Sequence, residues 1–149
     1  MLRVLILLLC AVVLMPAPGK LPKVTLAELS AESQLVCVGE VLTVEPQAMS
    51  PYEGMPSRRA SIRVVKSLKG SPPPEVNVVF VPGVSEEASL VVGRKYVLFL
   101  KSANRDYRTT VGSLGARELV DDGIDSSAIS GEPARQSIAD LERKLSLGK

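Results

Sequence analysis

The sequence contains no histidine and no tryptophan, and its only aromatic residues are three tyrosines and two phenylalanines among 149 residues. Without histidine the chain cannot form a Ser-His or Cys-His nucleophilic pair, and it lacks the commonest ligand of transition metals. Surfaces that stack bases or sugars usually need several aromatic rings on one face. We therefore expect no nucleic-acid partner, no cofactor and no metal site, and we do not expect an enzyme.

Cysteine is also scarce, with one residue at Cys10 and one at Cys37. Cys10 falls in an apolar N-terminal stretch, so a chain that loses this stretch has no partner for an internal disulfide. A reactive thiol needs an exposed, electropositive setting, whereas Cys37 stands between Val36 and Val38. We expect Cys37 to be a small buried side chain in a strand, with an intermolecular disulfide as the alternative.

The first residues have the organisation of a secretory signal peptide. Arg3 supplies a positive charge, an apolar run covers residues 4–15, and small residues lead to an expected cleavage after Gly19. This run is too short for an uncleaved membrane span, which needs about 20 residues. A lipid anchor at Cys10 would require a small residue before it, and Leu9 stands there. We expect export to the periplasm or the extracellular space, with no transmembrane segment in the mature chain.

The charges of the chain nearly cancel, with 18 basic and 16 acidic side chains and a formal net charge of +2. Removal of residues 1–19 removes Arg3 alone among the charged residues, so the net charge falls by one. This balance is not typical of proteins that coat nucleic acid or anionic membranes. Residues 20–149 are enough for one domain with its own hydrophobic core.

Two helices are expected, one at each end of this domain. Thr25 and Glu28 form a T-x-x-E capping box, which predicts a short helix over residues 25–33. Residues 133–145 predict a C-terminal helix, with Pro133 in its first turn. Its apolar stripe, suited to docking on a sheet or barrel, consists of Ile138, Leu141 and Leu145.

The segment between the helices is typical of a series of short strands. Residues 35–44 are apolar on both faces, and Gly39 within them indicates a bulge or a bend. Residues 45–59 contain three prolines and predict a long loop that could carry function. Further strands are expected at residues 60–69, 75–81, 94–101 and 107–113. A short extended piece at residues 116–120 precedes a surface loop at residues 121–131.

Five strands without βαβ alternation favour an antiparallel barrel or sandwich. A long first strand with a glycine near its middle fits a small barrel, because that strand must curl to pair at both ends. The predicted fold is mainly β, a five-stranded OB-like antiparallel barrel with its core over about residues 25–120. A short N-terminal helix and a C-terminal helix complete it.

Three short patterns then follow one another in an order known from one superfamily: a helix leading into a V-G-x-V strand, a strand that ends in L-K-G, and a G-x-x-Y-x-x-F strand. The residues that carry them are Val38, Gly39, Val41, Val65, Lys69, Gly70, Gly93, Tyr96 and Phe99. Over about residues 25–120 the chain resembles the netrin/TIMP-like OB-fold superfamily, and in particular its exported bacterial members.

The resemblance implies the OB fold, and it raises the question whether this chain inhibits metalloproteases. The best-known members inhibit metalloproteases through a cysteine at the mature N-terminus, which chelates the target zinc and is held in place by a disulfide. This chain would begin near Lys20 after cleavage, and Cys37 has no partner. The inhibitory site therefore does not carry over, and inhibition through a different contact stays an alternative.

A basic stretch is the first candidate for a binding site. Residues 54–74 contain no acidic residue, and their basic residues are Arg58, Arg59, Arg63, Lys66 and Lys69. Such a stretch could meet an acidic protein, a polysaccharide or a lipid head group. The alternative is an ordinary solvated strand face that is balanced by carboxylates of other strands.

Two other groups of residues are candidates, one for catalysis and one for binding of a metal ion. Ser67 and Lys69 are two positions apart on one strand face, as a Ser/Lys catalytic dyad would need, but a lysine base must be desolvated and this one is expected at an exposed strand end. Asp121, Asp122 and Asp125 lie in one expected loop, but they lack the spacing and the terminal glutamate of a calcium loop. We expect ordinary loop solvation there.

The sequence thus favours an exported, non-catalytic OB-fold module that binds an extracytoplasmic protein or another anionic ligand. The alternatives are a metalloprotease-inhibitor-like protein without the N-terminal cysteine, and an enzyme with a hidden Ser/Lys site.

Overall fold

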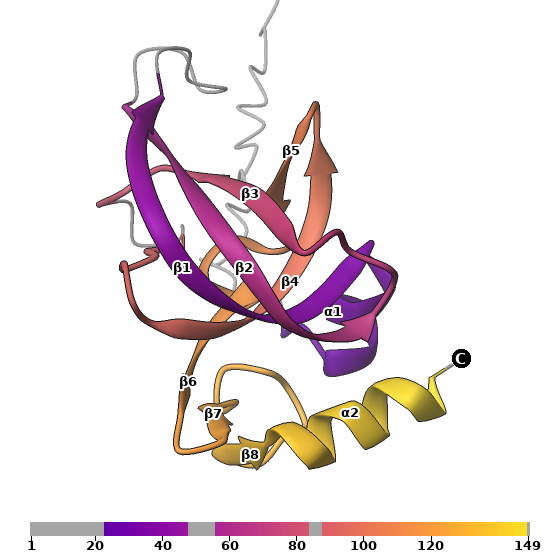
Figure 1. Cartoon of the computed structure of the whole chain (residues 1–149). Coiled ribbons are helices and arrows are strands. Elements are labelled where there is room, and N and C mark those ends of the chain that lie inside the picture. The colour runs from indigo at the N-terminus through magenta and orange to yellow at the C-terminus, as the bar shows by residue number, and fades with distance from the viewer. Residues whose placement is uncertain (1–22, 48–55, 84–87, 149) are drawn as a thin grey trace, which may run out of the picture.

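The computed structural model describes residues 23–47, 56–83 and 88–148. This part of the chain is mainly β with two α-helices, which confirms the predicted class (Figure 1). The elements in chain order are α1 (Leu26–Ala31), β1 (Leu35–Gln47), β2 (Ser57–Lys69), β3 (Glu75–Phe80), β4 (Lys95–Ala103), β5 (Asp106–Thr109), a 3₁₀ turn (Gly112–Gly115), β6 (Ala116–Val120), β7 (Gly123–Asp125), β8 (Arg135–Ser137) and α2 (Ile138–Leu147).

Five of the strands form a closed ring. Their order is β1-β2-β3-β5-β4, and β4 pairs back onto β1. The pairings are antiparallel except for the contact between β3 and β5, where Val78 lies opposite Tyr107 in parallel register. β6 pairs with β4, and β7 and β8 extend the sheet away from the ring. Figure 1 shows the ring above these three strands and α2.

β1 is long because two neighbours share it. Residues 36–47 pair with β2, and residues 35–40 also pair with β4. The register between β1 and β2 shifts at Gly39, which confirms the expected irregularity there. A Cβ at Gly39 would lie 2.4 Å from Cγ2 of Ile62 and 3.3 Å from Cδ1 of Leu98. The close approach of three strands therefore requires glycine at this position.

Buried apolar side chains form two clusters, one on each face of the ring strands. Cys37, Ile62, Leu98 and Tyr96 belong to the first cluster, together with residues of β3. Phe99 belongs to the second, which joins the opposite face of β1 and β4 to both helices. Tyr96 and Phe99 thus lie on opposite faces of β4, as their spacing predicts, and both are buried.

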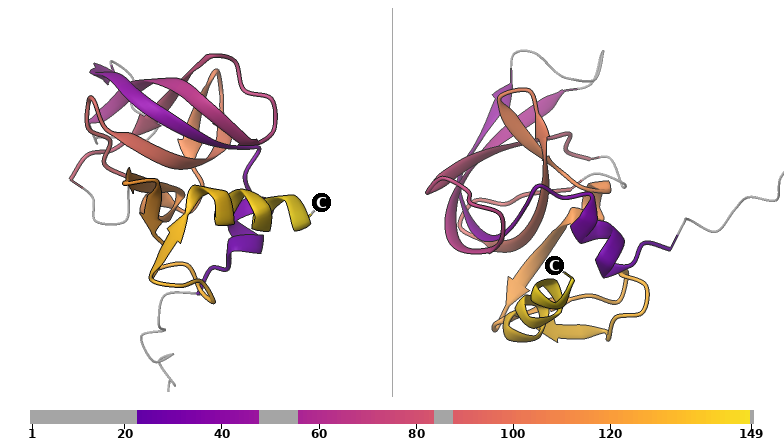
Figure 2. Two further views of the ribbon diagram at one scale, coloured as in Figure 1. Left: turned by 60° about the horizontal axis from the view of Figure 1, so that its bottom comes forward. Right: turned by 90° about the vertical axis from the view of Figure 1, so that its right-hand side faces the viewer.

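The two helices cover this second cluster (Figure 2). α1 begins with the expected capping box, in which Thr25 Oγ1 accepts from the Glu28 amide and the Glu28 carboxylate accepts from the Thr25 amide. Leu141 and Leu145 of α2 are buried, and Ile138 is partly buried beside them. The apolar stripe predicted for the C-terminal helix is therefore confirmed.

The predicted start of that helix is wrong. The backbone of Arg135–Ser137 forms β8, and α2 begins only at Ile138 with Ser137 as its N-cap. Ser137 Oγ accepts from the Asp140 amide at 3.2 Å, so a side-chain cap, and not Pro133, determines where the helix starts. The segment before it is extended because it pairs with β7.

The predictions for two loops and one strand are also wrong in their bounds or content. The loop at 121–131 contains β7, because its backbone pairs with β6 and β8. The fifth strand ends at Thr109 and not at residue 113, because Val111 and Gly112 have φ angles of 53° and 55° and turn the chain into a 3₁₀ helix. The loop at 45–59 is shorter than expected, since β1 extends to Gln47 and β2 begins at Ser57; residues 48–55 lie outside the described part.

Within residues 23–47, 56–83 and 88–148, no helix is long and apolar enough to cross a membrane. The expected signal peptide, its cleavage site and Cys10 lie outside the described residues.

Candidate binding surface

The basic residues singled out in the sequence all lie on β2, and the structure gives most of them separate partners. Arg63 forms an ion pair with Glu40 of β1 at 2.5 Å, and their side chains are 58% and 25% exposed. Lys66 pairs with Glu142 of α2 at 2.6 Å. These two cations are balanced by carboxylates of other elements, which is the alternative that the sequence left open.

Lys69 has a structural environment. Its Nζ donates to the carbonyl oxygens of Ser30 and Ser33, with 2.8 Å to the second of these. Ser30 lies in the last turn of α1 and Ser33 follows its C-cap Glu32, so both carbonyls are near the negative end of the helix dipole, which favours a cation. Lys69 therefore fastens the end of β2 to the end of α1.

The proposed Ser/Lys dyad is not formed. The hydroxyl of Ser67 donates to the carbonyl oxygen of Gly70 at 2.9 Å, in a tight turn where Gly70 has a φ of 79°. Lys69 directs its ammonium group to the α1 carbonyls instead, as described above. A lysine whose Nζ donates to two carbonyl oxygens is not placed to accept a proton from a neighbouring serine.

Arg59 and Arg58 lie near the other end of β2, where the strand comes close to the turn between β4 and β5. Nη2 of Arg59 pairs with Oδ1 of Asp106 at 2.6 Å, and the Asp106 side chain is only 12% exposed. Arg58 lies opposite the buried Phe80 of β3 and is exposed. Within the described part of the chain Arg58 makes no ion pair.

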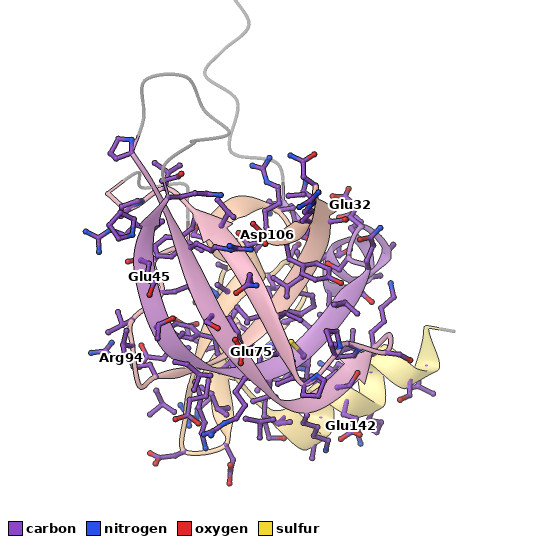
Figure 3. All side chains as sticks on the ribbon, turned by 45° about the horizontal axis from the view of Figure 1, so that its top comes forward. Glu32, Glu45, Glu75, Arg94, Asp106 and Glu142 are labelled. Carbon is purple, nitrogen blue, oxygen red and sulfur yellow. The ribbon has the colours of Figure 1, made fainter. Side chains whose placement is uncertain are left out.

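The sequence analysis missed one residue at this place, Arg105. Arg105 belongs to the turn between β4 and β5, directly before Asp106, and it is exposed without an ion pair to any described residue. The segment was treated only as a spacer because nothing local connects it to β2. We call Arg58, Arg59, Arg105 and Asp106 together the hairpin-end surface. Figure 3 shows Asp106 behind β3, where the turn approaches β2.

Cys37 is fully buried and unpaired in the first apolar cluster. Burial raises the pKa of its thiol to about 12. The thiolate is the form that attacks substrates and binds metals, so the setting of Cys37 favours neither chemistry at neutral pH.

The three aspartates also have local explanations. Asp121 and Asp122 form the turn between β6 and β7, with φ angles of 49° and 60° that suit a tight hairpin and that aspartate tolerates. Oδ1 of Asp125 accepts from the amide and the hydroxyl of Ser127, and these hydrogen bonds lower the pKa of Asp125. Within the described residues no cluster of three metal-ligating side chains occurs.

Comparison with known proteins does not assign this chain to a family. No protein-family model matches the chain, and no curated protein matches it.

Proposed function

We propose that the chain is an exported, non-catalytic binding module with an OB-like barrel, which recognises an acidic segment of an extracytoplasmic protein through the hairpin-end surface. The strand order supports the fold assignment. A ring of the order β1-β2-β3-β5-β4, with β3 and β5 parallel, is the arrangement of a five-stranded Greek-key barrel. The resemblance of the sequence to the netrin/TIMP-like superfamily agrees with it.

The location of two exposed arginines, neither of which forms an ion pair with a described residue, carries the functional proposal. OB-type barrels bind oligonucleotides and oligosaccharides on the face of strands β2 and β3 and on the loops between β1 and β2 and between β4 and β5. Arg58 lies on β2 and Arg105 lies in the turn between β4 and β5, and each adjoins one member of the Arg59–Asp106 pair. The pair therefore joins the two segments that carry Arg58 and Arg105.

The chemistry of this surface favours carboxylates as the recognised groups. A guanidinium presents two parallel N–H donors that match a carboxylate, and it is more weakly hydrated than an ammonium group. Phe80, the aromatic residue opposite Arg58, is buried and presents no face for stacking. An acidic protein segment fits these properties better than a sugar or a base, which would need stacking.

The contacts of the nucleophile candidates support a non-catalytic role. Cys37 is buried with a raised pKa, and Ser67 and Lys69 each bind a separate main-chain group. Export rests on the N-terminal sequence, with its charged start, its apolar run and the small residues that follow.

Chemical cross-linking with a charge-reversed variant tests this function. The purified protein is cross-linked in the extracytoplasmic fraction of the cells that make it, and the captured proteins are compared with those of an Arg58→Glu/Arg105→Glu variant. Arg143→Glu on α2 is the matched control, because Arg143 is 68% exposed and lies on a different element. We expect an acidic protein that the wild type and the control capture and the double variant loses. Equal capture by all three proteins rejects the assignment.

A further inference from the structure

A groove of about 600 Å³ lies between residues 88–94 and the strands that extend the sheet beyond the ring, and no residue of the hairpin-end surface lines it. Three arginines from three different segments line it, together with two exposed valines and a glycine. These residues are Val91, Arg94, Arg117, Val120, Gly123 and Arg135. Figure 3 labels Arg94 at the margin of the molecule, apart from Asp106.

The three guanidinium groups are not equally compensated. Arg94 pairs with Glu118 at 3.3 Å, and both side chains are about half exposed. Arg135 donates to the main-chain oxygens of Val120 and Asp121 and makes no ion pair with a described residue. These two hydrogen bonds hold the guanidinium group of Arg135 in place, but no carboxylate of a described residue balances its positive charge.

Arg117 is the least satisfied of the three. Its Nη2 donates to the carbonyl oxygen of Ser113 at 3.1 Å, and its Nε is buried without a hydrogen-bond partner. A buried donor without a partner carries a desolvation cost that a correctly placed acceptor removes. The carboxylate of Asp125 also lines the groove, but its Oδ1 is occupied by the Ser127 amide and hydroxyl.

We propose that this groove binds a monocarboxylate that carries a short aliphatic chain. The charged lining residues are Arg94, Arg117 and Arg135 against Glu118 and Asp125, a formal excess of one positive charge. One monoanion neutralises this excess, whereas a dianion would reverse it. The forked donors of the guanidinium groups match a planar carboxylate.

The remainder of the wall suits an aliphatic chain. Val91 and Val120 are 43% and 49% exposed, and both line the groove. The Tyr96 hydroxyl accepts from the Val91 amide at 3.1 Å and holds residues 88–94 against β4. A Cβ at Gly123 would lie 3.0–3.1 Å from the guanidinium of Arg135, so glycine leaves the space that this side chain occupies beside the groove.

Titration of the purified protein with isovalerate tests the proposal, with calorimetry and backbone-amide NMR as the measurements. We expect a Kd on the order of 1 mM, the strength of a small ligand with few contacts. The amide shifts should concentrate at residues 88–94 and around Arg117, Gly123 and Arg135. The neutral isostere isovaleramide should bind at least about tenfold more weakly, because it lacks the charge that the arginines recognise.

Substitutions identify the groups responsible. Arg117→Gln should weaken isovalerate binding about tenfold, the size of one charged hydrogen bond. Arg94→Gln changes a half-exposed arginine that already pairs with Glu118, and it should weaken isovalerate binding about threefold. This variant replaces Arg117→Gln as the test if the Arg117→Gln protein fails to fold. Asp125→Asn removes the competing carboxylate and should strengthen binding about threefold. Arg143→Gln, on α2 outside the groove, is the control with unchanged affinity.

Three results would overturn the proposal. Equal binding of isovaleramide excludes charge recognition, tighter binding of inorganic phosphate excludes a monocarboxylate, and shifts outside residues 88–94 and β6–β8 exclude the groove. None of the four residues of the hairpin-end surface lines the groove, so the outcome is independent of the function proposed above.

Discussion

Arg59 on β2 and Asp106 at the first residue of β5 form an ion pair with 2.6 Å between Nη2 and Oδ1. The two residues are 47 positions apart in the chain, and β3 lies between their strands in the ring. The Arg59 side chain is 46% exposed, whereas that of Asp106 is 12% exposed. Water therefore solvates Arg59, whereas the charge of the mostly buried Asp106 depends on its contact with Arg59.

Replacement of either member of this pair should destabilise the fold. Arg59→Gln leaves Asp106 without its cation and is expected to lower the free energy of unfolding by about 1 kcal/mol, because solvent screens the exposed guanidinium in part. Urea unfolding of Arg59→Gln, Asp106→Asn and the double variant measures the coupling. The exposed Arg143–Asp140 pair on α2 is the comparison and should give about 0.3 kcal/mol. Equal coupling of the two pairs would contradict the account.

Gly39→Ala tests the close approach of the ring strands. The new methyl group would lie 2.4 Å from Cγ2 of Ile62, so we expect a loss of about 1–3 kcal/mol in the free energy of unfolding. Ile62→Leu moves the branch away from Cβ and should cost about 1 kcal/mol alone. Combined with Gly39→Ala it should restore part of the loss. A Gly39→Ala protein as stable as the wild type would show that the strands do not meet so closely.

The thiol of Cys37 should make the stability depend on pH above neutrality. Burial raises its pKa from the ordinary 9.0 to about 12, so the folded state keeps the proton at pH values where the unfolded state loses it. The unfolded state then binds fewer protons, and stability falls as pH rises from 9 to 12, by at most about 1.4 kcal/mol per pH unit.

Cys37→Ala isolates this contribution. Burial also raises the pKa of Tyr96, but Tyr96 is present in both proteins, so the difference in pH slope belongs to Cys37. We expect the wild type to lose stability more steeply than the variant between pH 9 and pH 11, measured by urea unfolding. Parallel slopes would place the thiol in solvent.

Lys69→Met should loosen the contact between β2 and α1. Without the ammonium group the carbonyl oxygens of Ser30 and Ser33 lose a charged donor, and we expect a loss of about 1–2 kcal/mol with faster hydrogen exchange in α1. Ser67→Ala removes a single exposed hydrogen bond and serves as the control, with a change below about 0.5 kcal/mol. If the two variants have equal stability, Lys69 does not cap the helix.

Local signals in the sequence predicted much of the fold. The capping box of Thr25 and Glu28 and the apolar stripe of α2 each depend on neighbours a few positions apart. The start of α2 was also encoded locally, since Ser137 and Asp140 form an S-x-x-D cap that the proline at 133 obscured. β7 and β8 were missed because strands of three residues have no periodicity of their own and exist through pairing.

The candidate surfaces were harder to predict because their contacts are long-range. The basic stretch on β2 looked uniform in the sequence, yet four of its five basic residues contact separate partners, which are Asp106, Glu40, Glu142 and the carbonyls at the end of α1. Arg105 lies in a turn with no local motif, and Arg94, Arg117 and Arg135 lie in three separate segments of the chain. The architecture alone brings them together, and a sequence without its strand pairings does not contain that information.

The central claim is that the hairpin-end surface recognises carboxylates of a protein chain. Fluorescence anisotropy with a labelled oligo-glutamate peptide measures this directly, at low and at physiological salt. The account predicts that the wild type and Arg143→Glu bind equally, that Arg58→Glu/Arg105→Glu binds at least about tenfold more weakly, and that added salt reduces the difference. Equal affinity of the wild type and the double variant, with the fold of both intact, would contradict it.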